Sequence, residues 1–308
     1  MAAITLTGLQ VLRAVADRGS FTAAAEGLGY TQSAISRQVA SLEAAAGATM
    51  FRRGAGGTEL TEAGRVLLGH AVDVLDRLDG AQRELDALHD TARGRLRVGA
   101  FATAVAALLP RALAAFRQTH PSVAVTLREG STLAQLRRVA AGGVDAAVVS
   151  SLERLDDSRL RFEPLLDDPL LLAVPRTHAL AGRRSVALDD LASERWISAS
   201  TDPNQTLLGT WDAPGWEPDV VFIAREWTAK LGLVAAGLGV TLVPGLAAIA
   251  VRDDVALVRV RADPPVARRV VLATREGEPD APHLAAFVDT LHAVAAALGA
   301  EIQQRVQR

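Results

Sequence analysis

The chain lacks several features that define large classes of proteins. It has 308 residues and no cysteine, which excludes disulfides, zinc sites built from cysteine and redox sensing through a thiol. Lys230 is the only lysine among 33 lysines and arginines, so guanidinium groups carry nearly all of the basic charge. No apolar run reaches the roughly 18 uncharged residues that a membrane-spanning helix needs, so no membrane association is expected.

The chain also lacks a strong net charge and a metal-ligand pattern. The formal net charge is −2, and residues 1–60 hold five arginines and four acidic residues, a net of +1. Any patch that binds nucleic acid must therefore be local. The six histidines show no metal-ligand spacing, and neither a metal nor a cofactor is expected. The N-terminus has the pattern of an amphipathic helix with Arg13 and Asp17 rather than of a signal peptide, which predicts a cytoplasmic protein.

Residues 20–43 predict two short helices joined by a tight, glycine-marked turn. Ser20 or Thr22 can cap the first helix and Thr31 the second, since a side-chain oxygen there accepts a hydrogen bond from an orphan backbone N–H. The second helix buries the apolar row Ile35, Val39, Leu42 and Ala46. Its other side carries Gln32, Ser33, Ser36 and Arg37. These side chains can read base edges in a major groove, although an ordinary solvated helix face has the same pattern.

A glycine-rich turn follows this helix pair. Two short extended runs flank residues 54–57 and predict a β-hairpin wing. Arg52 and Arg53 lie on the wing, where they can contact phosphates or a minor groove. The alternative is a surface loop with two solvated arginines. A helix-turn-helix followed at once by a wing is more specific than either part.

Residues 4–64 resemble the winged helix-turn-helix of LysR-type transcriptional regulators. The resemblance is carried by the segments SFTAAAEGL, TQSAISRQVASLE, MFRR and LTEAG. The chain departs from the family pattern at Gly56 and Glu59, where the wing commonly carries basic residues. Fewer phosphate contacts at the wing would weaken binding to DNA and flatten its salt dependence.

Residues 61–92 predict one long helix, with Thr61 as a possible cap and Glu62 in the first turn. An unbroken heptad stripe runs along it and is typical of a two-helix seam. The stripe consists of Leu67, Ala71, Val74, Leu78, Ala81, Leu85 and Leu88. The alternative is a helix packed on its own domain. The resemblance implies a dimerisation helix, which would place two recognition helices on a roughly palindromic operator, and it further implies a dimer of dimers.

From residue 94 onward, strand and helix patterns alternate. Strands are predicted near residues 96–98, 123–127, 144–149, 162–166, 170–174, 196–198, 220–224, 240–243 and 268–273, and helices near 105–119, 132–141, 227–236 and 282–300. This order predicts a largely parallel, doubly wound sheet. The length suits two α/β lobes better than one.

The predicted fold is α/β overall, with three parts. Residues 1–60 form the all-α-type winged helix-turn-helix domain, 61–92 the linker helix and 93–308 the effector-binding domain. The resemblance implies a two-lobed effector domain like a periplasmic binding protein, with the end of the chain returning to the first lobe. Lobe 1 then spans about 93–160 plus 267–308, and lobe 2 about 161–266.

Ligands of open α/β sheets bind beyond the carboxyl ends of the strands, near helix N-termini. The candidate effector-binding residues at these points are Phe101, Thr103, Ser131, Thr132, Ser150, Ser200, Thr201 and Trp227. Each hydroxyl can also be a simple helix cap, and either aromatic ring can belong to the core.

Two other functions compete with a regulator. An enzyme is disfavoured, because Gly237 and Gly239 form only half of a dinucleotide fingerprint and no catalytic constellation appears. A solute-binding protein leaves the first 90 residues without a role. The sequence therefore predicts a regulator that binds double-stranded DNA, responds to a small-molecule effector and forms homo-oligomers, with RNA polymerase as a further candidate partner.

Overall fold

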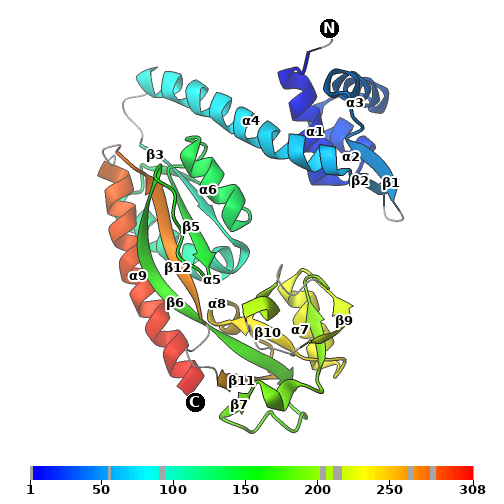
Figure 1. Ribbon diagram of the computed structural model, residues 1–308. Helices are drawn as coiled ribbons and strands as arrows, with labels where there is room; N and C mark the ends of the chain where they lie inside the picture. The colour runs from blue at the N-terminus through cyan, green and yellow to red at the C-terminus, as the bar shows by residue number, and fades with distance from the viewer. Residues whose placement is uncertain are drawn as a thin grey trace. The chain divides into compact units, whose positions relative to one another are not determined.

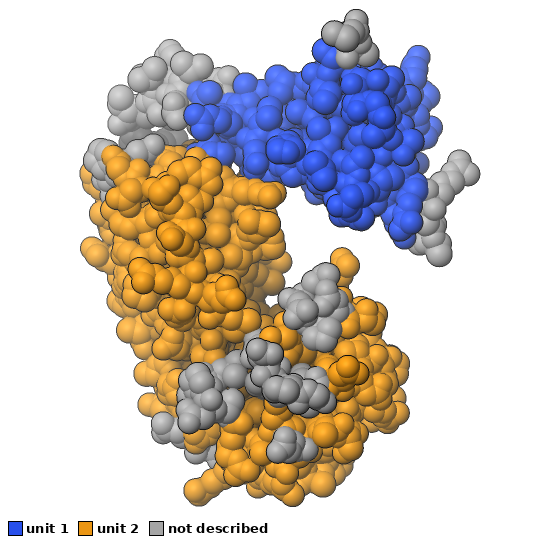
Figure 2. Space-filling model, viewed as in Figure 1, with its two compact units in different colours: residues 1–92, 141–143 blue, residues 93–140, 144–308 orange. Residues whose placement is uncertain are grey.

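The structure is a computed structural model that describes residues 3–54, 57–89, 94–201, 206–210, 217–261, 267–277 and 282–307. The chain forms two compact units, residues 1–92 with 141–143 and residues 93–140 with 144–308 (Figures 1 and 2). They are called the N-terminal unit and the C-terminal unit below. Each has its own hydrophobic core.

The N-terminal unit begins with α1 (Leu6–Arg18), α2 (Phe21–Leu28) and α3 (Gln32–Ala46). Thr5, Ser20 and Thr31 cap these helices, each accepting a hydrogen bond from a backbone N–H three residues later. Gly29 and Gly47 end α2 and α3 with φ of +68°, a conformation that side-chain-bearing residues rarely adopt. The predicted helix pair and its caps at Ser20 and Thr31 are therefore confirmed.

The predicted wing and long helix follow α3. Strands β1 (Phe51–Gly54) and β2 (Gly57–Leu60) pair antiparallel. Helix α4 (Glu62–His89) begins after Thr61, whose hydroxyl accepts a hydrogen bond of 3.0 Å from the Gly64 N–H. The capping side chain predicted at Thr61 is thus in place.

Two hydrophobic clusters hold the N-terminal unit together. The apolar row predicted for α3 is buried, because Ile35 and Val39 pack with α1 and α2 and Leu42 packs with α1 and α4. Ala71 and Leu75 of α4 belong to the same core. The first half of α4 is thus part of the folded N-terminal unit as well as a connection.

The C-terminal unit begins with two β-α-β crossovers. Strands β3 (Arg95–Ala100), β4 (Ala124–Glu129) and β5 (Ala146–Ser151) run parallel in the order β4-β3-β5. Helices α5 (Ala102–Thr119) and α6 (Thr132–Ala140) connect them. Here the local pattern and the predicted parallel pairing agree.

The prediction of a largely parallel sheet is wrong for the strands that come next in the sheet, whose pairings are antiparallel. The strands expected at 162–166 and 170–174 form one 16-residue strand, β6 (Leu160–Pro175). Its first half pairs antiparallel with β12 (Ala267–Arg275), and its second half pairs antiparallel with β10 (Thr241–Pro244) and β11 (Val255–Arg261). Periodicity identifies strands but carries no information about their relative direction, which is set by pairing partners far away in the sequence.

The second half of β6 organises a further group of elements. Strands β8 (Arg195–Ser198) and β9 (Asp219–Ile223) pair parallel, and β7 (Ser185–Ala187) joins β11. Helices α7 (Trp227–Ala235) and α8 (Gly245–Ala248) and the 3₁₀ turns Asp189–Leu191 and Leu207–Thr210 complete the group. The sequence pattern missed β7, β11 and α8, which are short or lack a clean apolar alternation.

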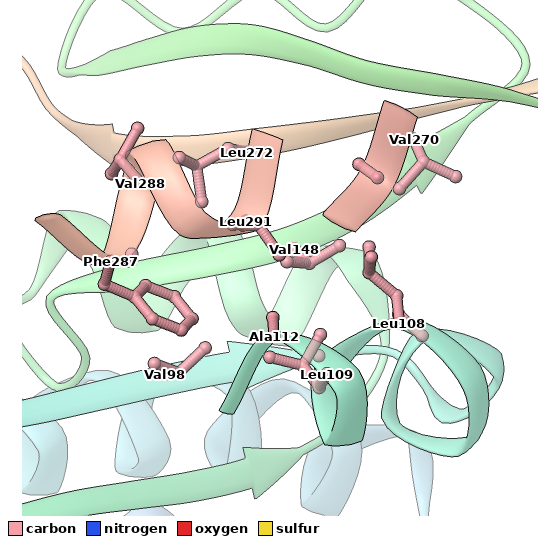
Figure 3. Close-up of a cluster of buried hydrophobic side chains, with 14 of the residues drawn as sticks. Val98, Leu108, Leu109, Ala112, Val148, Val270, Leu272, Phe287, Val288 and Leu291 are labelled. Carbon is pink, nitrogen blue, oxygen red and sulfur yellow. The ribbon is translucent and has the colours of Figure 1, made fainter. Parts of the chain in front are cut away.

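Helix α9 (Pro282–Gln307) closes the chain and packs against α5 and β6 (Figure 1). Phe287 of α9 meets Phe116 of α5 edge to face, with ring centroids 5.5 Å apart. Figure 3 shows Phe287, Val288 and Leu291 facing the side chains of α5 and the sheet. Among the described helices, α9 is long and apolar enough to cross a membrane by composition, with a hydropathy of 1.4. One face of α9 packs in this core, and 33% of the apolar window is buried.

Candidate nucleic-acid interface and effector site

The exposed face of α3 carries the predicted base-reading side chains. Gln32, Ser33 and Arg37 are exposed, and Ser36 is half-buried between them. The Gln32 amide donates a hydrogen bond of 2.9 Å to the Ser36 hydroxyl, and the Arg37 Nε donates one of 3.3 Å to the Ser33 carbonyl. Both bonds are local and solvent-exposed, so they orient the side chains without burying them. The four residues thus form one accessible polar row.

The wing contains an ion pair that the sequence analysis did not foresee. Arg52 and Glu59 lie opposite each other on β1 and β2, and the guanidinium and carboxylate are 2.9 Å apart. Glu59, noted above as a departure from the family pattern, therefore compensates the charge of Arg52. The side chain of Arg53 and all of Gly56 lie outside the described residues.

The proposed dimerisation stripe divides into two parts. Ala71 is 0% exposed and Leu67 is partly buried, and both pack in the core of their own chain. Ala71 is therefore not available to a second helix, which corrects that part of the predicted seam. Val74 and Leu78 are 45% and 47% exposed, and Ala81 is also exposed. The side chains of Leu85 and Leu88 lie outside the described residues.

Three predicted effector-binding residues surround the start of α6. The Ser131 hydroxyl caps the helix by accepting a hydrogen bond of 3.3 Å from the Ala134 N–H. The Thr132 hydroxyl donates to the Ser150 carbonyl at 2.9 Å and accepts from the Ser150 N–H at 3.2 Å. These contacts join α6 to the end of β5. The hydroxyls of Ser131 and Thr132 thus have structural partners within the protein.

A second site lies where β8, α7, β10 and β12 meet. A pocket of ≈ 370 Å³ is lined there by Ile197, Ser198, Ala199, Thr206, Leu207, Leu208, Arg225, Trp227, Lys230, Thr241, Leu242 and Arg268. This volume is within the range of metabolite-binding pockets. Of the predicted residues, only Trp227 lines it. Ser200 and Thr201 follow β8 close by in sequence but are not part of its wall.

Arg268 connects this pocket to two other predicted residues through a buried network. Its Nη2 donates hydrogen bonds to Asp168 Oδ2 at 2.5 Å and to the Thr103 hydroxyl at 3.0 Å. The guanidinium carbon lies 5.1 Å from the centre of the Phe101 ring. Asp168 is fully buried, and its Oδ1 accepts a hydrogen bond of 2.8 Å from the Leu246 N–H. Burial raises the pKa of Asp168, and the charge of Arg268 opposes that rise.

Asp168, Lys230 and Arg268 were missed as site residues by the sequence analysis. Asp168 and Arg268 are cross-strand neighbours on β6 and β12, a pairing that no local pattern reveals. Lys230 had a usable signal, because the only lysine of the chain stands in an otherwise apolar helix. A charged residue on the buried side of a helix is uncommon without a role.

Comparisons with known proteins agree with this arrangement. Residues 6–65 match the model of the bacterial regulatory helix-turn-helix protein, lysR family, and residues 89–296 match the LysR substrate binding domain. The chain belongs to the LysR family of transcriptional regulators. This LysR-family member is therefore a sequence-specific DNA-binding regulator with an effector-binding domain, as the sequence resemblance predicted.

Individual relatives support the assignment over most of the chain. The HTH-type transcriptional regulator AlsR of Bacillus subtilis is 31% identical over 249 residues, which cover 79% of this chain and 81% of that protein. The crystal structure of CbnR, a LysR family transcriptional regulator, matches with a TM-score of 0.62 at 25% identity, covering 94% and 99% of the two chains. Full-length CbnR complexed with its target DNA matches with a TM-score of 0.55 at 26% identity.

Proposed function

We propose that this LysR-family regulator reads its operator with Gln32, Ser33, Ser36 and Arg37 of α3 and contacts phosphates with Arg52 and Arg53 of the wing. The observation that carries the proposal is the accessible polar row of α3, which presents an amide, two hydroxyls and a guanidinium on one helix face. These groups pair with adenine, with guanine and with backbone phosphates. A small molecule bound in the C-terminal unit then switches the complex. The protein acts without catalysis, in the cytoplasm.

The proposed domain division follows from these roles. Residues 1–60 bind DNA, residues 61–92 join two chains, and residues 93–308 bind the effector.

We place the effector in the pocket beside Trp227, with Arg268 linking it to Phe101 and Thr103. Arg268 lies on β12, which pairs with both β5 and β6. A ligand that contacts Arg268 is thus positioned to change how the elements around β5 are arranged relative to those around the second half of β6. It can do so only through a difference in affinity for the two arrangements.

The test is binding to a labelled DNA fragment from upstream of the protein's own gene, titrated over salt and against a scrambled competitor. Specific binding with a steep dependence of log affinity on log salt is expected. If neither this fragment nor any fragment from a random-sequence selection is preferred over scrambled DNA, the proposed reading role is wrong.

Replacing Arg37 with alanine should weaken binding to the selected operator by about 1–3 kcal/mol, the scale of one bidentate base contact. Binding to scrambled DNA should change much less, because Arg37 is assigned to bases. Fluorescence anisotropy with both DNAs measures the difference. Arg65→Ala is a suitable control, since the Arg65 guanidinium donates hydrogen bonds to the Glu62 carboxylate of α4 and to the Leu60 carbonyl of β2. An equal loss on both DNAs would contradict base reading by Arg37.

Replacing Glu59 with glutamine should strengthen binding to all DNA sequences at low salt. The Glu59 carboxylate holds the Arg52 guanidinium 2.9 Å away, and its removal frees one cation for a phosphate. The slope of log affinity against log salt should steepen by about 0.9, the value for one additional phosphate contact. Asp254→Asn removes the same charge from an exposed ion pair in the C-terminal unit and should leave the slope unchanged. An unchanged slope for Glu59→Gln would show that Arg52 does not contact the backbone.

Replacing Leu78 with lysine should dissociate the dimer that we assign to Val74, Leu78 and Ala81. Leu78 is exposed within its own chain, so the substitution introduces charge into the seam without disturbing the core. Light scattering over a range of protein concentrations measures the mass. Leu152→Lys, at an exposed leucine outside α4, serves as the control. An unchanged mass for Leu78→Lys would remove α4 from the interface.

A further inference from the structure

Lys230 is a buried cation without an anionic partner among the described residues. It lies on α7, is 7% exposed and lines the pocket beside Trp227. Its Nζ is 4.4 Å from the centre of the Trp227 ring. Among the residues that the structure describes, the ammonium group of Lys230 makes this cation–π contact and no ion pair. Burial lowers the pKa of Lys230 to about 8, so the group is still mostly charged at neutral pH.

Two arginines add to the positive charge of the same wall. Arg268 is 9% exposed, and its Nε is buried without an acceptor among the described residues. Arg225 is exposed and lies at the turn between β9 and α7. No aspartate or glutamate is among the described residues that line the pocket. The carboxylate of Asp168 is held by Arg268 and is fully buried, and Glu226, four positions before Lys230, is exposed at the start of α7.

The charge balance of the pocket therefore favours a particular ligand. Lys230, Arg225 and Arg268 contribute three positive charges, and Asp168 compensates one of them. A buried charge is costly unless it is paired, so an anion bound beside Lys230 would lower the electrostatic energy of the pocket. The remaining wall combines hydroxyls of Ser198 and Thr241 with aliphatic side chains. This composition suits a small molecule with an apolar body and anionic ends.

We propose that the effector of this regulator is a small organic dianion, with one anionic group paired with Lys230 and the other with the Arg268 side of the pocket. The inference rests on the proposed function, because it takes this pocket to be the effector site. It adds the charge class of the ligand and gives the single lysine of the chain a role. An anionic group of the bound ligand compensates the positive charge of Lys230. Without it, this buried ammonium has no anionic partner among the described residues.

The first test measures binding to the full chain by calorimetry at pH 7. The probes are succinate, glutarate, phthalate and inorganic phosphate, with acetate as the monoanion and succinamide as the neutral analogue. At least one organic dianion should bind at least tenfold more tightly than acetate, and succinamide should not bind. Lys230→Met should weaken the dianion at least tenfold, whereas Arg183→Met, which removes an exposed arginine outside this pocket, should have no effect.

The second test uses the uniqueness of Lys230. Its ε-amino group and the chain's α-amino group are the only amines available to an acylating reagent, so mass spectrometry reports each separately. A bound dianion should protect Lys230 from acylation and leave the α-amino group reactive. Affinity should fall as the pH rises above about 8, because the ammonium is lost there. Lys230→Arg should remove this pH dependence, since Arg225, Arg268 and the substituted arginine all stay charged.

The outcomes separate this inference from the proposed function. Failure of succinate, glutarate and phthalate to bind or to protect Lys230 overturns the inference, as does equal binding of succinamide. Neither result affects the DNA-binding assay, which can still reveal a regulator that responds to a neutral molecule. Conversely, a dianion that binds and protects Lys230 supports the inference even if operator binding does not respond to it. That response, measured by anisotropy with and without the dianion, is what tests the proposed switching role of the pocket.

Discussion

Replacement of Asp168 with alanine is expected to lower the free energy of unfolding of the C-terminal unit by about 3–5 kcal/mol. The substitution leaves the Arg268 guanidinium buried without its 2.5 Å partner. It also removes the acceptor of the Leu246 N–H, which loses a hydrogen bond of 2.8 Å. Both losses occur in a region that joins β6, β12, α5 and α8. We therefore expect the largest loss of stability of any substitution considered for this protein.

Urea unfolding followed by tryptophan fluorescence measures this effect selectively. All four tryptophans lie between residues 196 and 227, so the signal reports on the C-terminal unit. Asp168→Asn is the matched control, because the amide keeps an acceptor for Leu246 while it loses the charge. It should cost less than the alanine variant. A loss below about 1 kcal/mol for Asp168→Ala would show that the pair contributes little, as exposed ion pairs do.

A double replacement separates pairing from burial. Asp168→Leu together with Arg268→Met substitutes apolar side chains for both charges, and such exchanges of buried pairs are often neutral or stabilising. Burial raises the pKa of Asp168, which indicates that desolvation costs this carboxylate more than its partners return. The double variant should therefore recover most of the stability lost by either single change. Its effector binding should remain impaired, because Arg268 lines the pocket.

Replacement of Lys230 with methionine is expected to have the opposite effect. It should raise the free energy of unfolding at neutral pH. The pKa of Lys230 falls from 10.5 to about 8 on folding, which corresponds to about 3 kcal/mol of penalty for the buried ammonium. Loss of the cation–π contact with Trp227 offsets about 1 kcal/mol of this gain. A net stabilisation of about 2 kcal/mol remains. Methionine keeps the apolar part of the side chain in place.

The pH dependence gives this prediction a clear sign. A lowered pKa means that the folded protein binds the proton less tightly than the unfolded chain does. The penalty is therefore fully present below about pH 8 and is lost as the pH rises from about 8 to 10.5. The urea concentration at the midpoint of unfolding should be higher for Lys230→Met than for the natural chain. This difference should be large at pH 7 and small near pH 10. A difference that does not change with pH would rule out desolvation as its cause. A substitution that stabilises the protein and weakens ligand binding is expected where a charge serves function at a cost in stability.

The local structure of the N-terminal unit could be predicted from the sequence because its signals act over short distances. Ser20 and Thr31 cap helices through bonds to residues three positions away, and Gly47 ends α3 because it tolerates a positive φ. The spacing of Ile35, Val39 and Leu42 defines which face of α3 is buried, and so which face is free. The same local signals predicted the family and the candidate base-reading residues.

Only the tertiary structure decided the features that depend on pairing between distant residues. Asp168 and Arg268 are 100 positions apart and meet because β6 and β12 run antiparallel, a direction that strand periodicity does not encode. Ala71 follows the heptad stripe yet lies in the core of its own chain, because α1 covers that side of α4. Lys230 is in the sequence as a single unusual residue, but its burial beside Trp227 and Arg268 follows from the meeting of α7 with β10 and β12. Hydrogen bonds and side-chain spacing along one helix are local, whereas strand direction and burial are properties of the whole packed unit.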